Sequence, residues 1–557
     1  MRTAGTRPAE GSSRLGRRDV LRMGLAASGA LAATPLLDRL GNGADGVGAV
    51  NLLSLAPKSD RDVGPPPNFP RFSQPFRVPP VLRPSRIANG VRFYELEQRP
   101  ALQQILPRPF PPTPIFGFNG IFPGPTIEQT RGGPLTVVAN KNSLPRGNPY
   151  STHLHGSPNQ PFYDGHPEDL VPVGATKTYR YPNNEEARTL WYHDHAIDVT
   201  SQHVYAGLLA FFLHQPAAAE VNEFGLNRLP SGRYDVPLVI TDIQYTPDGR
   251  VFFDDHGEDS LFGNVVLVNG VPWPFMTVDR AKYRFRILQA SVSRGYDLRL
   301  SNGMPMTVIA TDSGFVRRPI PVSSFRMGTA ERYEVVLDFS SLRPGTKVTL
   351  LNTAAEDQMR EVMQFVVGNA EGPRQELPVQ LNEPVFPKPA DVVRDRLFRF
   401  ERSGGQWVIN GLPWDERVVA TPRANTTERW VFENKSGGWF HPVHVHLVDF
   451  QIVRRNGRAP FAYENGLKDT AYVGENERLE LLMTFRPPQP VDPGQPVLGR
   501  YVMHCHNLVH EDHAMMTEFD VQPGRAAAAS ARHGFATDDG RSNRHAKGMM
   551  VQWELRA

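Results

Sequence analysis

The sequence predicts an all-β protein built from three tandem Greek-key β-sandwiches. The 557-residue chain is too long for one ordinary domain. Its 52 Pro and 48 Gly indicate many short segments joined by turns. An Asn-Gly turn followed about 15 residues later by an alternating strand occurs three times, which indicates an internal repeat.

The repeated unit is the Asn-Gly turn together with its downstream run of alternating residues. In chain order the pairs are Asn119-Gly120 with 135–140, Asn269-Gly270 with 283–288, and Asn410-Gly411 with 429–434. They recur every 140–150 residues or so. Period-2 patterning between turns is typical of β-sandwiches. Helices should be few, with one short helix near 198–205.

The breaks in composition predict the boundaries of these units. Pro-rich stretches precede the first unit and separate the second from the third. The predicted parts are a signal peptide (1–33), a Pro-rich lead-in (34–84), three β-sandwich domains (85–216, 230–370 and 393–525), a linker (371–392) between the second and third, and a mobile tail (526–557).

The N-terminus has the pattern of a twin-arginine export signal. Arg17-Arg18 leads into an apolar run over 23–37, with Ala-Leu-Ala at 30–32 as the expected cleavage site. A short membrane anchor is the alternative, but the run is interrupted by Gly24, Gly29 and Pro35 and is short for a span. We therefore expect a periplasmic, cell-surface or secreted protein with no membrane span.

Charge and cysteine content narrow the function. The 61 basic and 58 acidic residues nearly cancel, so nucleic acid is not expected as a partner. The chain is expected to be a monomer. Cys505 is the only cysteine, so no internal disulfide can form. A lone thiol in an oxidising compartment is a liability unless a metal occupies it.

Most of the 17 histidines fall in spaced pairs. Alternate residues of a strand face the same side, so each His-x-His presents two imidazoles to one point. Eight imidazoles are too many for one ion but enough for a cluster of three. One such pair alone would often be ordinary strand residues; four together indicate metal. The pairs are His153/His155, His193/His195, His444/His446 and His504/His506.

The motif His504-Cys505-His506 predicts a second metal. If Cys505 points to one face of a strand, its two neighbours point to the other. His441, Cys505, His510 and a weak axial Met515 form the His₂Cys set that is typical of blue copper. Met515 beside Met516 would by itself be read as core packing. Zinc prefers a closed tetrahedral set and would gain nothing from a thioether.

These motifs resemble those of the multicopper oxidase family, over most of the mature chain. They read HLHG, WYHDHA, HPVHVH and HCHNLVHEDHAMM, and with HLVDFQIV they look most like bilirubin oxidases and spore-coat-type laccases. The resemblance implies three cupredoxin domains and four copper ions. Type 1 copper would be held by His441, Cys505, His510 and Met515, type 2 copper by His153 and His444, and the type 3 pair by His155, His193, His195, His446, His504 and His506.

The resemblance also implies roles for residues outside the copper motifs. Asp164 and Glu511 are expected to supply protons, because reducing O₂ to water consumes four of them in a buried site. The alternative for each is a structural carboxylate. Trp439 is either a surface residue beside the type 1 copper or a packed aromatic. No motif includes His166, His203, His214, His256 and His513, or His533 and His545 in the tail.

The activity implied is oxidation of a small reducing substrate coupled to reduction of O₂. Phenols, aromatic amines and bilirubin-like tetrapyrroles are the expected substrates, with electrons passing through the edge of His441 or His510. A metal oxidase acting on Mn(II) or Cu(I) is one alternative, although no Met-rich insertion is visible among the 14 Met. A non-enzymatic cupredoxin scaffold is another, disfavoured by the complete ligand set.

Overall fold

The computed structural model describes residues 65–255, 259–415 and 417–524. The predicted signal peptide, most of the lead-in, His256 and the tail with His533 and His545 lie outside these ranges. Among the described residues, no helix has the length and apolar character that crossing a membrane requires.

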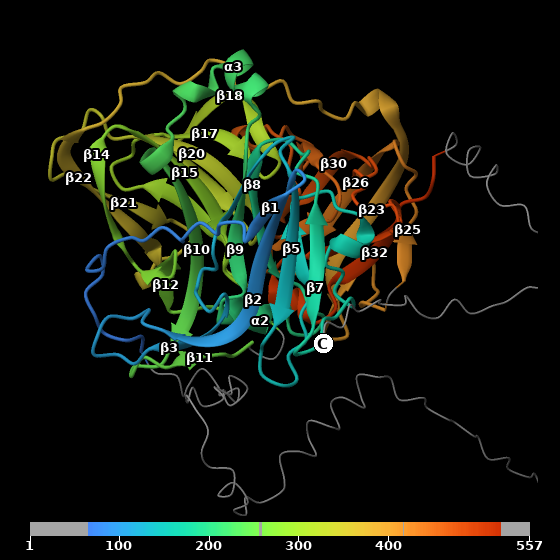
Figure 1. Cartoon of the computed structure of the whole chain (residues 1–557), viewed down its shortest axis with the longest axis horizontal. Helices are drawn as coiled ribbons and strands as arrows, with labels where there is room; N and C mark the ends of the chain where they lie inside the picture. The colour runs from blue at the N-terminus through green and yellow to red at the C-terminus, as the bar shows by residue number, and fades with distance from the viewer. Residues whose placement is uncertain (1–64, 256–258, 416, 525–557) are drawn as a thin grey trace, which may run out of the picture. The chain divides into compact units, whose positions relative to one another are not determined.

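The first sandwich consists of two sheets formed by residues 86–215. One sheet has the order β1-β2-β5-β7 with β3 beside β2, and the other has the order β4-β9-β8-β6. Figure 1 shows β1, β2, β5 and β7 side by side in blue to cyan. The strands are β1 (Arg86–Ala88), β2 (Val91–Gln103), β3 (Thr113–Phe118), β4 (Ile127–Thr130), β5 (Leu135–Asn142), β6 (Thr152–His155), β7 (Thr176–Tyr181), β8 (Arg188–Asp194) and β9 (Leu209–Gln215).

The second sandwich is formed by residues 235–371. Its larger sheet has the order β13-β12-β10-β15-β20-β17-β18 with β11 beside β10, and its smaller sheet β14-β22-β21-β16-β19. The strands are β10 (Asp235–Tyr245), β11 (Val251–Phe252), β12 (Val265–Val268), β13 (Val271–Pro272), β14 (Phe275–Arg280), β15 (Lys282–Gln289), β16 (Tyr296–Leu300), β17 (Met306–Thr311), β18 (Gly314–Val322), β19 (Ser324–Met327), β20 (Arg332–Asp338), β21 (Lys347–Asn352) and β22 (Glu361–Glu371).

The third sandwich is formed by residues 392–520. Its sheets have the orders β24-β23-β26-β30-β28 and β25-β32-β31-β27-β29. No strand lies between Glu371 and Val392. The strands are β23 (Val392–Ser403), β24 (Gln406–Ile409), β25 (Val418–Ala420), β26 (Thr427–Asn434), β27 (His441–Val445), β28 (Phe450–Arg455), β29 (Thr470–Val473), β30 (Arg478–Thr484), β31 (Arg500–Cys505) and β32 (Met516–Asp520).

The three Asn-Gly turns occupy equivalent places in the three sandwiches. Both residues of each turn have positive φ, between 50° and 74°, as a tight hairpin turn requires. The Asn side-chain oxygen of each accepts a hydrogen bond from a backbone N–H of the long strand that begins the sandwich. These bonds are Glu97 N to Asn119 (2.9 Å), Val239 N to Asn269 (2.8 Å) and Arg399 N to Asn410 (2.8 Å). The triplication predicted from the sequence is therefore structural as well.

The sandwich cores are filled by apolar side chains from both sheets of each pair. In the third sandwich Trp430 and Phe432 of one sheet meet Tyr501, Met503 and Cys505 of the other, all fully buried. Burial of such side chains stabilises a fold by roughly 1.5–3 kcal/mol each. This core places the thiol of Cys505 in dry surroundings.

The α-helices are short. The predicted helix near 198–205 is α2 (Thr200–Ala206), and the described residues also form α3 (Ala218–Phe224) and α4 (Leu508–Asp512). The Asp512 carboxylate accepts hydrogen bonds from the backbone N–H groups of Thr200 (2.9 Å) and Ser201 (2.7 Å). This contact ties the start of α2 in the first sandwich to α4 in the third.

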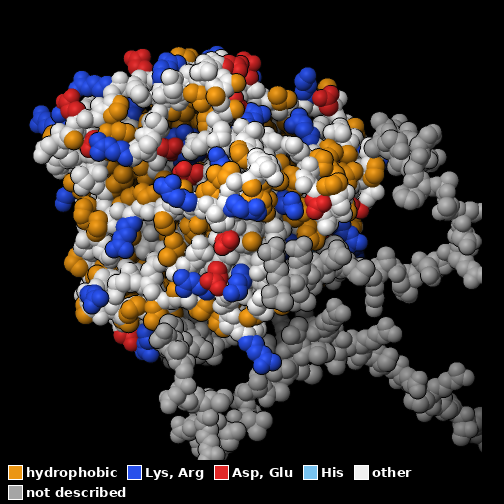
Figure 2. Space-filling model, in the orientation of Figure 1, with side chains coloured by type: hydrophobic (Ala, Val, Ile, Leu, Met, Phe, Trp, Pro, Cys, Tyr) orange, Lys and Arg blue, Asp and Glu red, His pale blue; other side chains and the backbone are white. Residues whose placement is uncertain are grey.

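Charged side chains are interspersed over the face of the described residues shown in Figure 2. Lys and Arg alternate there with Asp and Glu and with apolar side chains. That face therefore carries no extended field of one sign.

Candidate metal centre

Strand β31 presents its last residues to two different groups of side chains. Cys505 lies with His441 and His510 on one side, whereas His504 lies with His195 and His446 on the other. The next residue, His506, lies with His155 and His193. Alternation along an extended segment produces this division, as the sequence predicted. One short stretch of chain thus belongs to two separate sites.

The first site contains one thiol and two imidazoles, all fully buried. Nδ1 of His441 lies 3.3 Å and Nδ1 of His510 3.7 Å from Sγ of Cys505, and the two nitrogens are 3.2 Å apart. The outer nitrogens are occupied: Nε2 of His441 is 2.8 Å from the hydroxyl of Ser436, and Nε2 of His510 is 2.9 Å from the carbonyl of Asp259. The inner nitrogens and the thiol therefore converge.

Apolar and aromatic side chains enclose this first site. Met515 is fully buried in the same core cluster, and its carbonyl accepts a hydrogen bond from the backbone N–H of Cys505 at 3.0 Å. The Trp407 ring stacks on His510 with centroids 3.8 Å apart. Burial raises the pKa of the Cys505 thiol well above its ordinary value. A bound cation would be needed to hold it as a thiolate.

Trp439 lies next to the same site and is half-buried. Its ring centroid is 5.4 Å from that of His510, and Phe262 is parallel to it at 6.5 Å. The rings of His441 and His510 themselves have no exposed surface. The expectation that electrons enter through the edge of His441 or His510 stays a prediction, and any electron donor would be separated from the buried rings.

The second site gathers the four His-x-His pairs from the first and third sandwiches. Their ring nitrogens form three groups, and within each group one nitrogen of every residue lies within 4.8 Å of the others. All eight rings are at most 1% exposed. The groups are His153, His155 and His444; His155, His193 and His506; and His195, His446 and His504.

The eight imidazoles are kept neutral by burial. Desolvation is the first cause of the lowered pKa in each case, and the neighbouring imidazoles lower it further for most of them. The pKa of His195 falls to about 4, and the pKa values of His444 and His504 to about 3. Neutral imidazole is the form that binds a metal ion.

Asp164 is one of three acids that each contact two of these histidines. Its carbonyl is 2.6 Å from Nδ1 of His153, and its Oδ2 is 2.7 Å from Nδ1 of His446. Burial raises the pKa of Asp164 well above its ordinary value. The structure thus places this predicted residue directly behind two imidazoles.

Glu511 is the second acid. Its Oε1 lies 3.5 Å from Nδ1 of His195, and its Oε2 lies 2.9 Å from Nδ1 of His504. The inner Nε2 atoms of the two histidines face each other at 3.2 Å. Burial raises the pKa of Glu511 to about 7, against the opposing charge of His195.

Asp469 is the third acid, and the sequence reasoning missed it. Its Oδ1 is 3.1 Å from Nε2 of His155, and its carbonyl is 2.8 Å from Nδ1 of His444. Burial raises the pKa of Asp469, but the charge and hydrogen bonds of Arg332 outweigh it and lower the pKa to about 2. No spacing rule marks an acid at the start of β29, so only its buried surroundings could have revealed it.

The donor atoms left free point to a metal. Several buried ring nitrogens have no hydrogen-bond partner among the described residues, which is costly unless something binds them. They include Nδ1 of His155, Nε2 of His193, Nε2 of His446 and both nitrogens of His506. Imidazole with a thiolate and a thioether suits copper. The buried imidazoles, the thiol and the thioether therefore fit copper ions.

The other described histidines belong to none of these groups of ring nitrogens. His203 is fully buried, and its Nδ1 is 2.6 Å from Asp194, whose carbonyl in turn is 2.8 Å from Nδ1 of His193. His214 is also fully buried in β9. His166 contacts Glu518 at 2.9 Å, and His513 contacts Asp255 at 3.2 Å.

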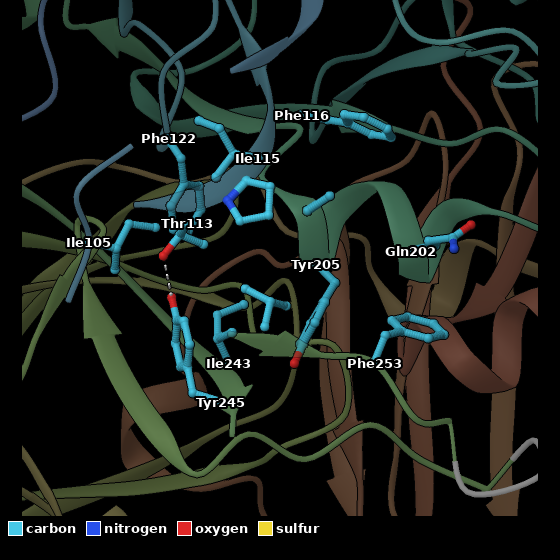
Figure 3. Close-up of a pocket in the computed structure, with 13 residues that line it drawn as sticks. Ile105, Thr113, Ile115, Phe116, Phe122, Gln202, Tyr205, Ile243, Tyr245 and Phe253 are labelled. Carbon is cyan, nitrogen blue, oxygen red and sulfur yellow. Dashed lines mark hydrogen bonds between the residues drawn. The ribbon is translucent and has the colours of Figure 1, made fainter. Parts of the chain in front are cut away.

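An apolar pocket lies between the first and second sandwiches (Figure 3). Ile115 and Phe116 of β3, Tyr205 of α2 and Ile243 of β10 line it, and Thr113 and Tyr245 are linked by a 3.4 Å hydrogen bond. Its cavity volume is about 30 Å³.

Comparison with known proteins agrees with this geometry. Sequence profiles of the multicopper oxidase family match residues 102–218, 191–355 and 386–525. A bilirubin oxidase of Albifimbria verrucaria is 37% identical over 488 residues, which cover 82% of each chain. A laccase of Bacillus subtilis is 31% identical over 522 residues, or 81% of this chain and 98% of that one.

The solved structures lead to the same family. The laccase of Pediococcus acidilactici superimposes with a TM-score of 0.72 at 27% identity, covering 82% of this chain and 95% of that one. The chain belongs to the multicopper oxidase family, and its fold of cupredoxin-like sandwiches is confirmed. Within that family it is a laccase-like, copper-dependent oxidoreductase that uses O₂ as electron acceptor.

Proposed function

We propose that the chain holds four copper ions in two sites and oxidises small aromatic substrates. The observation that carries this is the division of β31, whose last residues reach a thiol site and an imidazole cluster. Type 1 copper would be held by His441, Cys505, His510 and Met515, type 2 copper by His153 and His444, and the type 3 pair by His155, His193 and His506 with His195, His446 and His504.

The chemistry divides between the two sites. Bound copper would accept electrons singly from the substrate and supply four to O₂, which is reduced to two molecules of water. The peptide bonds on either side of Cys505 join the thiol site covalently to His504 and His506. Electrons could then pass from the thiol site to the imidazole cluster, so the reducing substrate would not need to meet O₂.

Two carboxyl groups would hold the protons that this reduction consumes. Asp164 lies behind His153 and His446, and Glu511 behind His195 and His504. Both are buried and stand on opposite histidine pairs, so each can hold a proton within reach of the cluster. The catalytic roles predicted for them are part of this proposal.

The enclosure of the thiol site would exclude water. Cys505, Met515 and Trp407 have no exposed surface, so the thiol meets only side chains. A dry shell of this kind also fixes the positions of His441 and His510. The site can then change charge by one electron with little rearrangement of the protein.

The reducing substrate would be a phenol, an aromatic amine or a bilirubin-like tetrapyrrole. The relatives named laccase and bilirubin oxidase support this class. The half-buried, parallel rings of Trp439 and Phe262 beside His510 also favour a flat aromatic molecule. Electrons would cross this aromatic layer.

The test is a copper count with O₂ uptake on the purified full chain. We expect four copper ions per chain, an intense blue absorption from the thiolate site, and O₂ uptake with a phenol or bilirubin. Mn(II) and Cu(I) are assayed in parallel. Protein that stays colourless and copper-free after expression with ample copper would refute the proposal, and O₂ uptake with the metal ions alone would refute the substrate class.

We also propose export by the twin-arginine route as a folded monomer. The Arg17-Arg18 motif and the single cysteine support it. Replacing both arginines by lysine should retain the protein in the cytoplasm, whereas continued export of that variant would refute the route. Sedimentation of the purified chain tests the monomer.

A further inference from the structure

Arg332 is a buried side chain of the second sandwich that reaches the surroundings of the imidazole cluster. None of the clustered histidines belongs to this sandwich. Arg332 begins β20 and has no exposed surface. Its guanidinium donates to both carboxylate oxygens of Asp469, at 2.6 and 2.5 Å. Such a paired contact fixes the plane of the carboxylate.

The other N–H groups of the Arg332 guanidinium donate hydrogen bonds to three backbone carbonyls. Nε donates to the carbonyl of Thr189 in the first sandwich at 2.9 Å. The terminal nitrogens also donate to the carbonyls of Ala330 and Asp312, both at 3.1 Å. The guanidinium therefore connects β8, β20 and the segment before β29, and it has no freedom to turn.

Asp469 contacts two histidines, one through its Nε2 atom and the other through its Nδ1 atom. Its carboxylate and its carbonyl can only accept hydrogen bonds. Nε2 of His155, 3.1 Å from the carboxylate, must then carry the proton and leave Nδ1 free. Nδ1 of His444, 2.8 Å from the carbonyl, must carry the proton and leave Nε2 free. The freed Nε2 of His444 faces Nε2 of His153 at 3.4 Å.

We propose that Arg332 is a positioning residue of the copper cluster, acting through Asp469 on the orientation and tautomer of His155 and His444. The proposal rests on the proposed function, since it concerns how this chain prepares its imidazoles for copper. The second sandwich would then contribute to the copper site although it supplies no copper ligand.

Gly156, directly after His155, shows how closely the ion pair abuts the site. A Cβ added there would lie 2.5 Å from Nη2 of Arg332 and 2.7 Å from Oδ2 of Asp469. The backbone at Gly156 also has φ +89°, which favours glycine. The strand end that carries His155 therefore rests on the ion pair itself.

The second sandwich offers a matched control in Arg286. It is also fully buried, and it also binds a carboxylate through two nitrogens, Asp235 at 2.7 and 2.8 Å. The Asp235 carboxylate pairs with Arg284 and Arg286 rather than with a histidine of the cluster. Arg286→Lys thus reproduces the loss of a buried guanidinium pair without touching the cluster.

The experiment loads copper-free Arg332→Lys, Arg286→Lys and unaltered full-length protein with Cu(II). Copper per chain, the blue absorption and the electron paramagnetic resonance signal of type 2 copper are measured. We expect Arg332→Lys to bind cluster copper about 10–100-fold more weakly, with an altered or missing type 2 signal. Its blue absorption should persist, and Arg286→Lys should match the unaltered protein in all three.

The outcomes separate the two proposals. Unaltered protein that binds no copper refutes the proposed function, whereas full loading of Arg332→Lys with an unchanged type 2 signal overturns the inference alone. Equal losses in Arg286→Lys also overturn it, because they would show a general effect on the fold. If Arg332→Lys does not fold, Asp469→Asn replaces it, and its full loading would overturn the inference as well.

Discussion

Gly165, the residue after Asp164, tests whether the close packing against strand β6 positions His153. Its φ is +75°, and a Cβ there would lie 2.2 Å from the carbonyl oxygen of Thr152 and 2.7 Å from the backbone nitrogen of His153. Both contacts are to the backbone of β6, which cannot rotate away. Gly165→Ala should therefore displace β6 where it delivers His153.

The magnitude follows from two contributions. Left-handed backbone costs a residue with a Cβ roughly 1–2 kcal/mol. Forcing extra volume against packed backbone costs roughly 1–3 kcal/mol more. Gly174 separates them, because its φ is +90° and a Cβ there would meet nothing within 4 Å. Gly174→Ala should show the first contribution alone.

The assay compares thermal unfolding and copper content of the two variants. We expect Gly165→Ala to unfold at a lower temperature than Gly174→Ala and to lose type 2 copper, since His153 is displaced. Gly174→Ala should retain its full copper content. Equal unfolding temperatures and equal copper contents would refute the reasoning, because only the Cβ at Gly165 would meet the backbone of β6.

Three further outcomes are expected. Cys505→Ser should abolish the blue absorption and the oxidase activity while the imidazole cluster keeps its copper, and a blue variant would contradict the thiol assignment. Asp164→Asn should lower kcat by roughly 10²-fold with KM for the reducing substrate unchanged; a kcat within twofold of the unaltered enzyme would exclude a proton role. Copper removal should lower the unfolding temperature, and added Cu(II) should restore it, because copper binds only the folded chain.

The triplicated fold could be predicted because its signals are local. The run at 429–434 falls within β26 (Thr427–Asn434), and the run at 135–140 within β5 (Leu135–Asn142). Asn410-Gly411 forms the tight turn that its two residue types favour. The helices α3 and α4 were not foreseen, since seven and five residues are too few to show a helical period.

The site could be predicted only as far as spacing carries chemistry. Because side chains alternate along a strand, the sequence shows which residues share a face in each His-x-His pair and in His504-Cys505-His506. Asp469 and Arg332 have no such signal, because their roles arise from contacts between sandwiches far apart in the sequence. The covering of His510 by Trp407 and the Asp259 carbonyl likewise depends on how loops fold over the site.

The imidazole cluster is shared between the two ends of the chain, and this has a consequence for biosynthesis. His153 and His444 face each other across 3.4 Å although 291 residues separate them. A nascent chain that ends before β31 lacks the thiol of Cys505 and two of the eight clustered imidazoles, those of His504 and His506. The copper sites can therefore form only after the third sandwich has been synthesised. A truncated chain stays colourless even if its first two sandwiches have folded.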